Sequence, residues 1–345
     1  MLAAVIHGPR DFRVEQVPDP RVEEPTDAVV RVVLSCVCGS DLWAWRGISA
    51  REPGERIGHE FLGVVDQVGS EVRTVHPGQL VVAPFVFSDG TCEYCTRGLH
   101  PSCPSGGIWG RPGYDGGQGE AVRVPLADAT LVPLPEDVDP DLLPAVLTLS
   151  DVMATGHHAA RMAGVRPGAT VAVVGDGAVG LCGVLASARL GAERIIALSR
   201  NPARSALAER FGATDVVPER GDDAVTAVRE LTGGRGVDCA LECVGTDQAM
   251  STAIGVTADG GQVGFVGIPH EVTSVDVRQM FSRNLGLRGG IAPARAYLPE
   301  LLDDVLAGRL DPGPVFDRTY SLAELPQAYR DMDERRTIKA LLRVG

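Results

Sequence analysis

Two short segments near the N-terminus carry residues of the types that can bind metal ions. Cys38 begins a Cys-Gly-Ser-Asp segment, and His59 is followed directly by Glu60. Catalytic zinc sites take three protein ligands from Cys, His and Asp or Glu, and leave one position open. A lone Cys or His is more often a core residue. The joint occurrence of these segments therefore predicts a catalytic metal site.

A glycine-rich turn stands in the middle of the chain. It follows the apolar run Val171–Val174 and precedes the helical stretch Leu181–Leu190. The pattern G-x-G-x-x-G permits a tight turn and brings backbone N–H groups at a helix N-terminus close to a pyrophosphate. We interpret it as a dinucleotide site, the alternative being an ordinary glycine-rich turn. The residues expected to contact the cofactor are Gly175, Gly177, Ala178, Val179 and Gly180.

The end of the next strand indicates which dinucleotide binds. NAD-binding folds carry an acidic residue about 20 residues after the glycine motif, where it accepts the ribose hydroxyls. Here the strand Arg194–Leu198 is followed by Ser199 and Arg200, without a carboxylate. An arginine fork and a hydroxyl can hold a 2′-phosphate. We predict NADP(H) in preference to NAD(H); alternatively, Arg200 is solvated and NAD is used with weak selectivity.

The elements that position these residues change in type along the chain. Up to about residue 150, short apolar runs are separated by Gly and Pro, which is typical of β structure. From 151 to 290, strands alternate with helices, which predicts a parallel sheet covered on both faces. Helices are expected at Tyr297–Ala307 and Leu322–Met332, and a last strand at Thr337–Val344.

The zinc-binding segments resemble those of a known family. The pattern G-H-E-x2-G-x5-G-x2-V beginning at Gly58 is similar to the zinc signature of the medium-chain alcohol dehydrogenases, and Cys-Gly-Ser-Asp at 38–41 resembles the segment that precedes it. The likeness covers essentially the whole chain. It implies an α/β fold with a β-rich, GroES-like catalytic domain (1–150 and 291–345) and a doubly wound Rossmann domain (151–290). It also implies a zinc-dependent alcohol dehydrogenase of the bacterial NADP-linked secondary-alcohol type.

The resemblance assigns roles at the catalytic site. Cys38 and His59 correspond to the first two zinc ligands, and Glu60 to the carboxylate that can approach or replace a ligand. Asp151 stands where the family places a Cys or Asp ligand, although a helix N-cap is the alternative. Ser40 corresponds to the hydroxyl that passes on the alcohol proton. Where family members often carry a relay His, this chain has Trp43.

A second cysteine cluster resembles the structural-zinc lobe of the same family. That lobe normally has four cysteines, and Cys92, Cys95 and Cys103 fit the last three places. The first place is taken by Asp89, which can bind zinc through oxygen. The site either holds zinc with an aspartate ligand or has lost its metal, and the three correctly spaced cysteines favour retention.

Further positions follow from the resemblance. Thr155 corresponds to the residue against the nicotinamide ring, and Lys339 to a cation that reaches the pyrophosphate. Lys339 is the only lysine, and a solvated strand residue is the alternative. The strand ends that line the cofactor cleft are Val244, Gly245, Val266, Gly267 and Ile268.

The substrate pocket is expected to be largely apolar. The candidate wall residues are Trp43, Trp45, Phe85, Trp109 and Ile291. Trp43 and Trp45 are equally suited to the core. The expected substrate is a small alcohol or its carbonyl product, with its oxygen on zinc. Three alternatives remain: a polyol, amino-alcohol or aldehyde dehydrogenase, a zinc-free quinone or enoyl reductase, and a non-enzymatic NADPH-binding protein.

The composition of the chain limits the classes of partner that it is expected to bind. The net charge is −13 and no basic block occurs, which argues against nucleic acid and anionic membranes. No apolar run is long enough to span a membrane, and the first residues predict a strand rather than a signal peptide. We expect a cytoplasmic homo-oligomer, either a dimer or a tetramer.

Overall fold

The computed structural model describes residues 1–270 and 272–345. They form two compact units. Unit 1 comprises Met1–Asp151 and Pro293–Gly345, and unit 2 comprises Val152–Ala292. The chain thus leaves unit 1 once and returns to it near the C-terminus.

Unit 1 is built on a seven-stranded sheet in the order β16-β17-β3-β4-β5-β9, with β8 also paired to β3. Valine, which packs well on a pleated sheet, is frequent in β3, β4, β5 and β8, and most residues of β3 and β5 are buried. Their bounds are β3 (Ala28–Cys36), β4 (Phe61–Val68), β5 (Leu80–Ala83), β8 (Ala121–Val124), β9 (Val132–Pro133), β16 (Phe316–Ser321) and β17 (Lys339–Arg343). Two small sheets accompany it, formed by β1 (Leu2–Gly8) with β2 (Asp11–Gln16) and by β6 (Val86–Phe87) with β7 (Gly107–Ile108).

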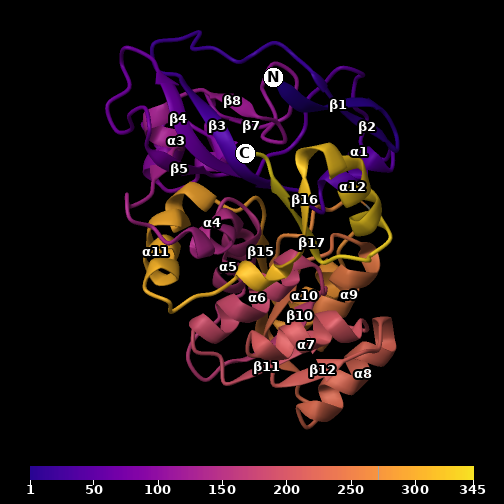
Figure 1. Ribbon diagram of the computed structural model, residues 1–345. Helices are drawn as coiled ribbons and strands as arrows, with labels where there is room; N and C mark the ends of the chain where they lie inside the picture. The colour runs from indigo at the N-terminus through magenta and orange to yellow at the C-terminus, as the bar shows by residue number, and fades with distance from the viewer. Residues whose placement is uncertain (271) are drawn as a thin grey trace. The chain divides into compact units, whose positions relative to one another are not determined.

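The C-terminal strand completes this sheet. β17 pairs antiparallel with β3, so that Leu341 stands opposite Cys36, and pairs in parallel with β16. Figure 1 shows the yellow C-terminal segment running back to the indigo N-terminal strands. Residues near opposite ends of the chain therefore become neighbours in the sheet.

Most helices of unit 1 are short, whereas α11 has 13 residues. They are α1 (Asp41–Trp45), α2 (Glu93–Thr96), α3 (Ala127–Thr130), α4 (Leu143–Thr148), α11 (Ala294–Leu306), α12 (Leu325–Asp333) and the 3₁₀ helices η1 (His100–Ser102), η2 (Pro140–Leu142), η3 (Gly313–Val315) and η4 (Leu322–Glu324). The helix expected at Leu322–Met332 is divided into η4 and α12. Pro326 lies in the first turn of α12, where its missing N–H costs no hydrogen bond.

Unit 2 is a parallel six-stranded sheet in the order β12-β11-β10-β13-β14-β15. The order reverses direction next to β10, as in doubly wound dinucleotide-binding folds. Its strands are β10 (Thr170–Val174), β11 (Arg194–Leu198), β12 (Asp215–Val217), β13 (Val237–Glu242), β14 (Thr257–Phe265) and β15 (Gly286–Gly289). Its helices are α5 (Val152–Met162), α6 (Ala178–Arg189), α7 (Pro202–Arg210), α8 (Gly221–Leu231), α9 (Asp247–Val256) and α10 (Val277–Arg283).

The α/β fold class inferred from the sequence is confirmed: a β-rich unit accompanies a parallel, helix-covered sheet. Among the described residues, no helix is long and apolar enough to cross a bilayer.

Candidate functional site

The strand register of unit 1 places the metal-binding segments together. Cys38 follows the end of β3, and His59 and Glu60 directly precede β4. Because β3 and β4 pair antiparallel with Ser35 opposite Phe61, the end of one lies beside the start of the other. The Ser35 hydroxyl also donates a hydrogen bond of 2.9 Å to the Glu60 carbonyl, which fixes the segment before β4.

Three predicted ligands have a spacing that suits a tetrahedral metal. Asp151 Oδ2 lies 3.5 Å from Cys38 Sγ and 3.2 Å from His59 Nε2. Ligand atoms bound to one tetrahedral zinc ion lie roughly 3.3–3.7 Å apart, as follows from bonds of about 2.0–2.3 Å. The donor atoms of these residues and of Glu60 all lie within 4.8 Å of one another, and all four residues are buried. The donor set therefore fits zinc.

The charges around this cluster favour a cation. Burial raises the pKa of the Cys38 thiol, and the neighbouring Asp151 charge raises it further. Burial by itself lowers the pKa of His59, but Cys38, Asp41 and Asp151 together raise it well above the usual value. Acidic side chains are thus crowded together in a buried site, a condition that a divalent metal ion relieves.

Asp41 contacts both His59 and Cys38, and the sequence pattern alone assigned no role to this position. Its Oδ1 lies 3.4 Å from His59 Nδ1, while Oδ2 accepts hydrogen bonds from the Cys38 N–H at 3.0 Å and from Gln118 Nε2 at 3.2 Å. Such a carboxylate orients the ring and strengthens it as a ligand. Its position in the Cys-Gly-Ser-Asp segment was the available signal.

Lys339 lies inside unit 1, next to the metal cluster. Its side chain is 1% exposed, and its ammonium donates to Glu60 Oε1 at 2.6 Å and to the Val37 carbonyl at 3.3 Å. Glu60 Oε2 is buried and has no hydrogen-bond partner among the described residues. The alternative of a solvated lysine is therefore wrong, and contact with a pyrophosphate would require this ammonium to leave Glu60.

The expected pocket residues have different environments. The Phe85 ring lies 6.3 Å from the His59 ring and forms an apolar wall beside the cluster. Trp109 instead packs between Phe61 and Phe87 and donates its indole N–H to the Pro84 carbonyl at 2.8 Å.

Trp109 thus belongs to the core, which corrects its assignment as a pocket wall. Trp45 is likewise a core residue, stacked on Tyr329. Trp43 is half-buried. The Ser40 hydroxyl does not cap α1, although Ser40 occupies the N-cap position.

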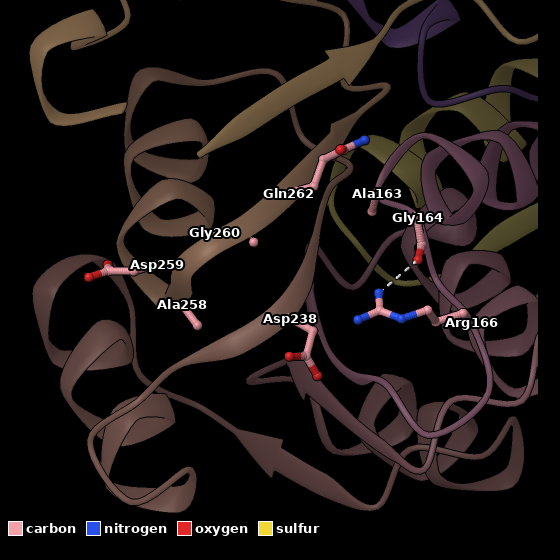
Figure 2. Close-up of a pocket in the computed structure, with 9 residues that line it drawn as sticks. Ala163, Gly164, Arg166, Asp238, Ala258, Asp259, Gly260 and Gln262 are labelled. Carbon is pink, nitrogen blue, oxygen red and sulfur yellow. Dashed lines mark hydrogen bonds between the residues drawn. The ribbon is translucent and has the colours of Figure 1, made fainter. Parts of the chain in front are cut away.

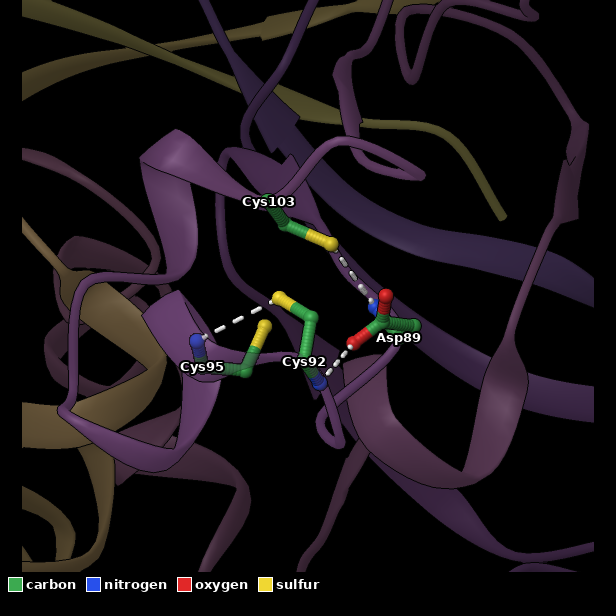
Figure 3. Close-up of side chains that lie close together, drawn as sticks. All are labelled: Asp89, Cys92, Cys95 and Cys103. Atoms are coloured by element: carbon green, nitrogen blue, oxygen red, sulfur yellow. Dashed lines mark hydrogen bonds between the residues drawn. The ribbon is translucent and has the colours of Figure 1, made fainter.

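The second cluster gathers in one loop of unit 1. Figure 3 shows Asp89, Cys92, Cys95 and Cys103 grouped together, and their ligand atoms lie within 4.8 Å of one another. Asp89 Oδ1 accepts the N–H groups of Thr91 at 2.8 Å and Cys92 at 2.9 Å, which lower the pKa of the Asp89 carboxyl. Burial raises the pKa of Cys95 to about 12. An ionised carboxylate beside three thiols fits a structural zinc site.

The glycine-rich turn of unit 2 has the backbone geometry that its sequence requires. Gly175 has φ +120°, a conformation that L side chains rarely adopt. A Cβ on Gly180 would lie 1.9 Å from the Gly175 carbonyl oxygen, so no larger residue fits there. Gly177 is the N-cap of α6 and carries no side chain to satisfy the first N–H groups of the helix. These groups remain suited to an anion.

A buried carboxylate organises the other strand ends. Glu242, the last residue of β13, accepts the N–H groups of Val244 at 2.7 Å and Gly245 at 2.8 Å through Oε1. The N–H groups of Val266 and Gly267 bond to the Glu242 carbonyl. These N–H groups are therefore engaged within the protein. Val244 and Ile268 keep exposed side chains.

The residues at the end of β11 have an unexpected neighbour. Ser199 Oγ donates to the carboxylate of Asp176, from the glycine-rich turn, at 3.2 Å. Arg200 is exposed. The residues that follow β11 in the sequence include no carboxylate, but the fold brings the Asp176 carboxylate to this strand end. Of the remaining predicted residues in unit 2, Thr155 is buried in α5 and Ile291 is exposed.

A cavity of about 200 Å³ lies elsewhere in unit 2. Figure 2 shows Arg166, Asp238 and Gln262 around it. Asp238 lies near the start of β13, and Gln262 of β14 is paired with the next residue, Cys239. Ligands of such sheets bind at the carboxyl ends of the strands. Asp238 is also paired with Arg235 and the Thr170 N–H. This cavity is not the cofactor site.

Comparison with known proteins agrees with this geometry. The alcohol dehydrogenase GroES-like domain matches residues 24–136, and the zinc-binding dehydrogenase domain matches residues 178–307. Zinc-type alcohol dehydrogenase B of Aspergillus flavus is 31% identical over 100% of this chain and 82% of its own length. The NADP-dependent isopropanol dehydrogenase of Thermoanaerobacter brockii is 33% identical over 86% of each chain.

A solved structure shares the whole fold. Alcohol dehydrogenase TADH from Thermus sp. ATN1 has a TM-score of 0.91 and 34% identity, with 100% of both chains covered. Full-length relatives, both domains and the buried donor set lead to the same assignment. The chain belongs to the zinc-dependent medium-chain dehydrogenases and is an oxidoreductase of the alcohol dehydrogenase type.

Proposed function

We propose that this enzyme transfers hydride between a small secondary alcohol, or its ketone, and NADP(H), with Cys38, His59 and Asp151 holding a catalytic zinc ion. The observation that carries the proposal is the spacing of these donors, 3.2 and 3.5 Å from the shared Asp151 oxygen. A zinc ion held there would act as a Lewis acid towards the substrate oxygen.

The residues around the donors have distinct tasks. Asp41 orients the His59 ring through Nδ1, which leaves Nε2 facing the cluster. Lys339 balances the charge of Glu60, a carboxylate that can approach the metal. Ser40 supplies a hydroxyl for proton transfer, and Phe85 and Trp43 exclude water from an apolar substrate.

The nicotinamide cofactor is proposed to bind unit 2. The turn at Gly175–Gly180 holds the pyrophosphate, and Thr155 and the ends of β13 and β14 approach the nicotinamide. Arg200, which follows the end of β11, supports NADP(H), as does similarity to an NADP-dependent relative.

We also propose that Asp89, Cys92, Cys95 and Cys103 hold a structural zinc ion. Such an ion would tie together a loop that contains only the short helices α2 and η1. It takes no part in the reaction, because four protein ligands leave no open position.

A homo-oligomer is proposed as the functional form. β15 is an edge strand, paired only with β14 among the described residues. Val277 and Phe281 of the preceding helix, α10, are 72% and 85% exposed. Two copies related by a two-fold axis could pair these edges and cover both side chains. Light scattering measures the expected dimer or tetramer.

The decisive experiment measures zinc per chain, together with NADPH oxidation by a ketone, in wild type, Cys38→Ser and Cys92→Ser. We expect two zinc ions in wild type and one in each variant, with turnover lost only in Cys38→Ser. One zinc in wild type, lost only in Cys38→Ser, would reject the structural site. A wild type without zinc, prepared without chelators, would reject the proposed catalysis.

A further inference from the structure

Three neighbouring strands of unit 2 bring polar side chains together at their carboxyl ends. β10, β11 and β12 are parallel and adjacent, so the turns that follow them lie along one edge of the sheet. Asp176 follows β10, Ser199 follows β11, and Arg220 is the N-cap residue of α8 after β12. The end of β11 is also the place where dinucleotide-binding folds meet the adenosine ribose.

Asp176 is the centre of this group. It is 6% exposed, and its Oδ2 accepts the Ser199 hydroxyl at 3.2 Å and lies 4.0 Å from Arg220 Nη2. Arg204, which is also buried, donates Nη1 to the Asp176 carbonyl at 2.8 Å. Ser199 therefore orients the carboxylate, and Arg204 fixes the backbone that carries it.

The contacts of Ser199 limit what it can offer a ligand. A hydroxyl has one proton to donate, and the Ser199 proton is directed to Asp176. The Ser205 hydroxyl donates to Ser199 Oγ at 3.1 Å. In this arrangement Ser199 gives no hydrogen bond to a 2′-phosphate, while Asp176 places negative charge beside it.

We propose that Asp176 sets the balance between NADP(H) and NAD(H). The inference rests on the proposed binding of a nicotinamide dinucleotide to this turn. Asp176 accepts the ribose 2′-hydroxyl of NAD(H), a task that other folds give to an acid at the second strand end. It also weakens the hold on a 2′-phosphate by opposing its charge and by occupying Arg220 and Ser199. Arg200 and Arg220 act in the other direction, as phosphate ligands.

Equilibrium binding of NADPH and NADH to wild type, Asp176→Asn and Arg220→Gln tests this without reference to activity. Asparagine keeps the size of the side chain and an acceptor for Ser199, but removes the charge. We expect Asp176→Asn to raise the ratio of NADPH to NADH affinity about tenfold or more, and Arg220→Gln to lower it by a similar factor.

Matched controls are Asp259→Asn and Arg235→Gln, which change the same charges elsewhere in unit 2 and should leave the ratio unchanged. Asp259 pairs with Arg283, and Arg235 pairs with Asp238. A ratio in Asp176→Asn equal to that of wild type would overturn the inference. Failure of wild type to bind either cofactor would overturn the proposed function along with it.

Ser199→Ala gives an independent test that removes only one oxygen atom. If the Ser199 hydroxyl donates its hydrogen bond to Asp176, the affinity for NADPH should change less than about threefold in this variant. A loss of about tenfold or more would mean that Ser199 holds the phosphate directly, which contradicts the arrangement proposed here.

Discussion

The two candidate metal clusters of unit 1 are built by the chain in different ways. Cys38 and Asp151 are separated by 113 positions and meet because strands and a helix end carry them together. The cluster at 89–103 comes from one loop with only the short helices α2 and η1. The first cluster is buried throughout, whereas Asp89 and Cys92 are partly exposed.

This difference suggests that a metal ion would serve catalysis at the first cluster and stability at the second. Around Cys38 and His59 the donors are held by the sheet and by Asp41, so their arrangement does not depend on the metal. The loop at 89–103 contains only the short helices α2 and η1, so a bound ion would supply part of its stability. Changes at the first cluster should affect catalysis, and changes at the second should affect metal retention.

The largest expected effect comes from His59→Asn. Turnover should fall about 10³-fold or more, because stabilisation by a Lewis acid is worth several kcal/mol. Circular dichroism should be unchanged, since the sheet positions this segment. The parallel variant Cys95→Ser should lower turnover less than about tenfold. Equal losses in the two variants would remove the distinction between the clusters.

Lys339→Met should be the most destabilising change near the first cluster. It leaves the Glu60 carboxylate buried without its cation, which typically costs about 3–5 kcal/mol. Guanidinium unfolding measures the loss. The double variant with Glu60→Gln should recover most of it, because the unpaired charge is gone. Wild-type stability in the single variant would show that Glu60 is neutral in the folded protein.

Asp41→Asn should weaken zinc binding at the first cluster by about 10–100-fold, the usual range for a residue that orients a ligand. Competition with a chelator gives the affinity. Asp66→Asn, on the exposed part of β4, provides the matched control. An unchanged affinity would mean that strand geometry alone orients His59.

The smallest effect is expected from Asp89→Cys. A fourth thiolate should slow zinc loss from the loop about tenfold, because zinc favours sulfur ligands. Turnover should not change. Ser105→Cys adds a thiol to the same loop at a position outside the cluster. Faster zinc loss in Asp89→Cys would indicate that the backbone hydrogen bonds of Asp89 matter more than its ligand atom.

Local sequence patterns predicted secondary structure well where the local structure directly requires certain residue types. The strand at Arg194–Leu198 was predicted with its observed bounds because a buried parallel strand is a short apolar run. The turn at Gly175 was predicted because only glycine suits that backbone. The division of Leu322–Met332 into two helices was missed, since the apolar periodicity continues across it.

Side-chain partners were predicted less well because they depend on register and strand order. Tryptophan is a residue type that can line a pocket. Only the packing of Trp109 against Phe61 and Phe87 shows that it belongs to the core. Asp176 lies 23 positions before Ser199, so a search limited to the strand end does not find it.

The order of the amino acids was enough to predict the thiol, imidazole and carboxylate donors, the glycine turn and the α/β fold class. These depend on residue type and short-range spacing, which a linear pattern carries. Which charged and polar side chains lie close together follows only from the tertiary structure. The pairing of β17 with β3 brings Lys339 to Glu60, and the strand order of unit 2 brings Asp176 to Ser199. Electrostatic energies depend on distance in space and on burial, and neither follows from position along the chain.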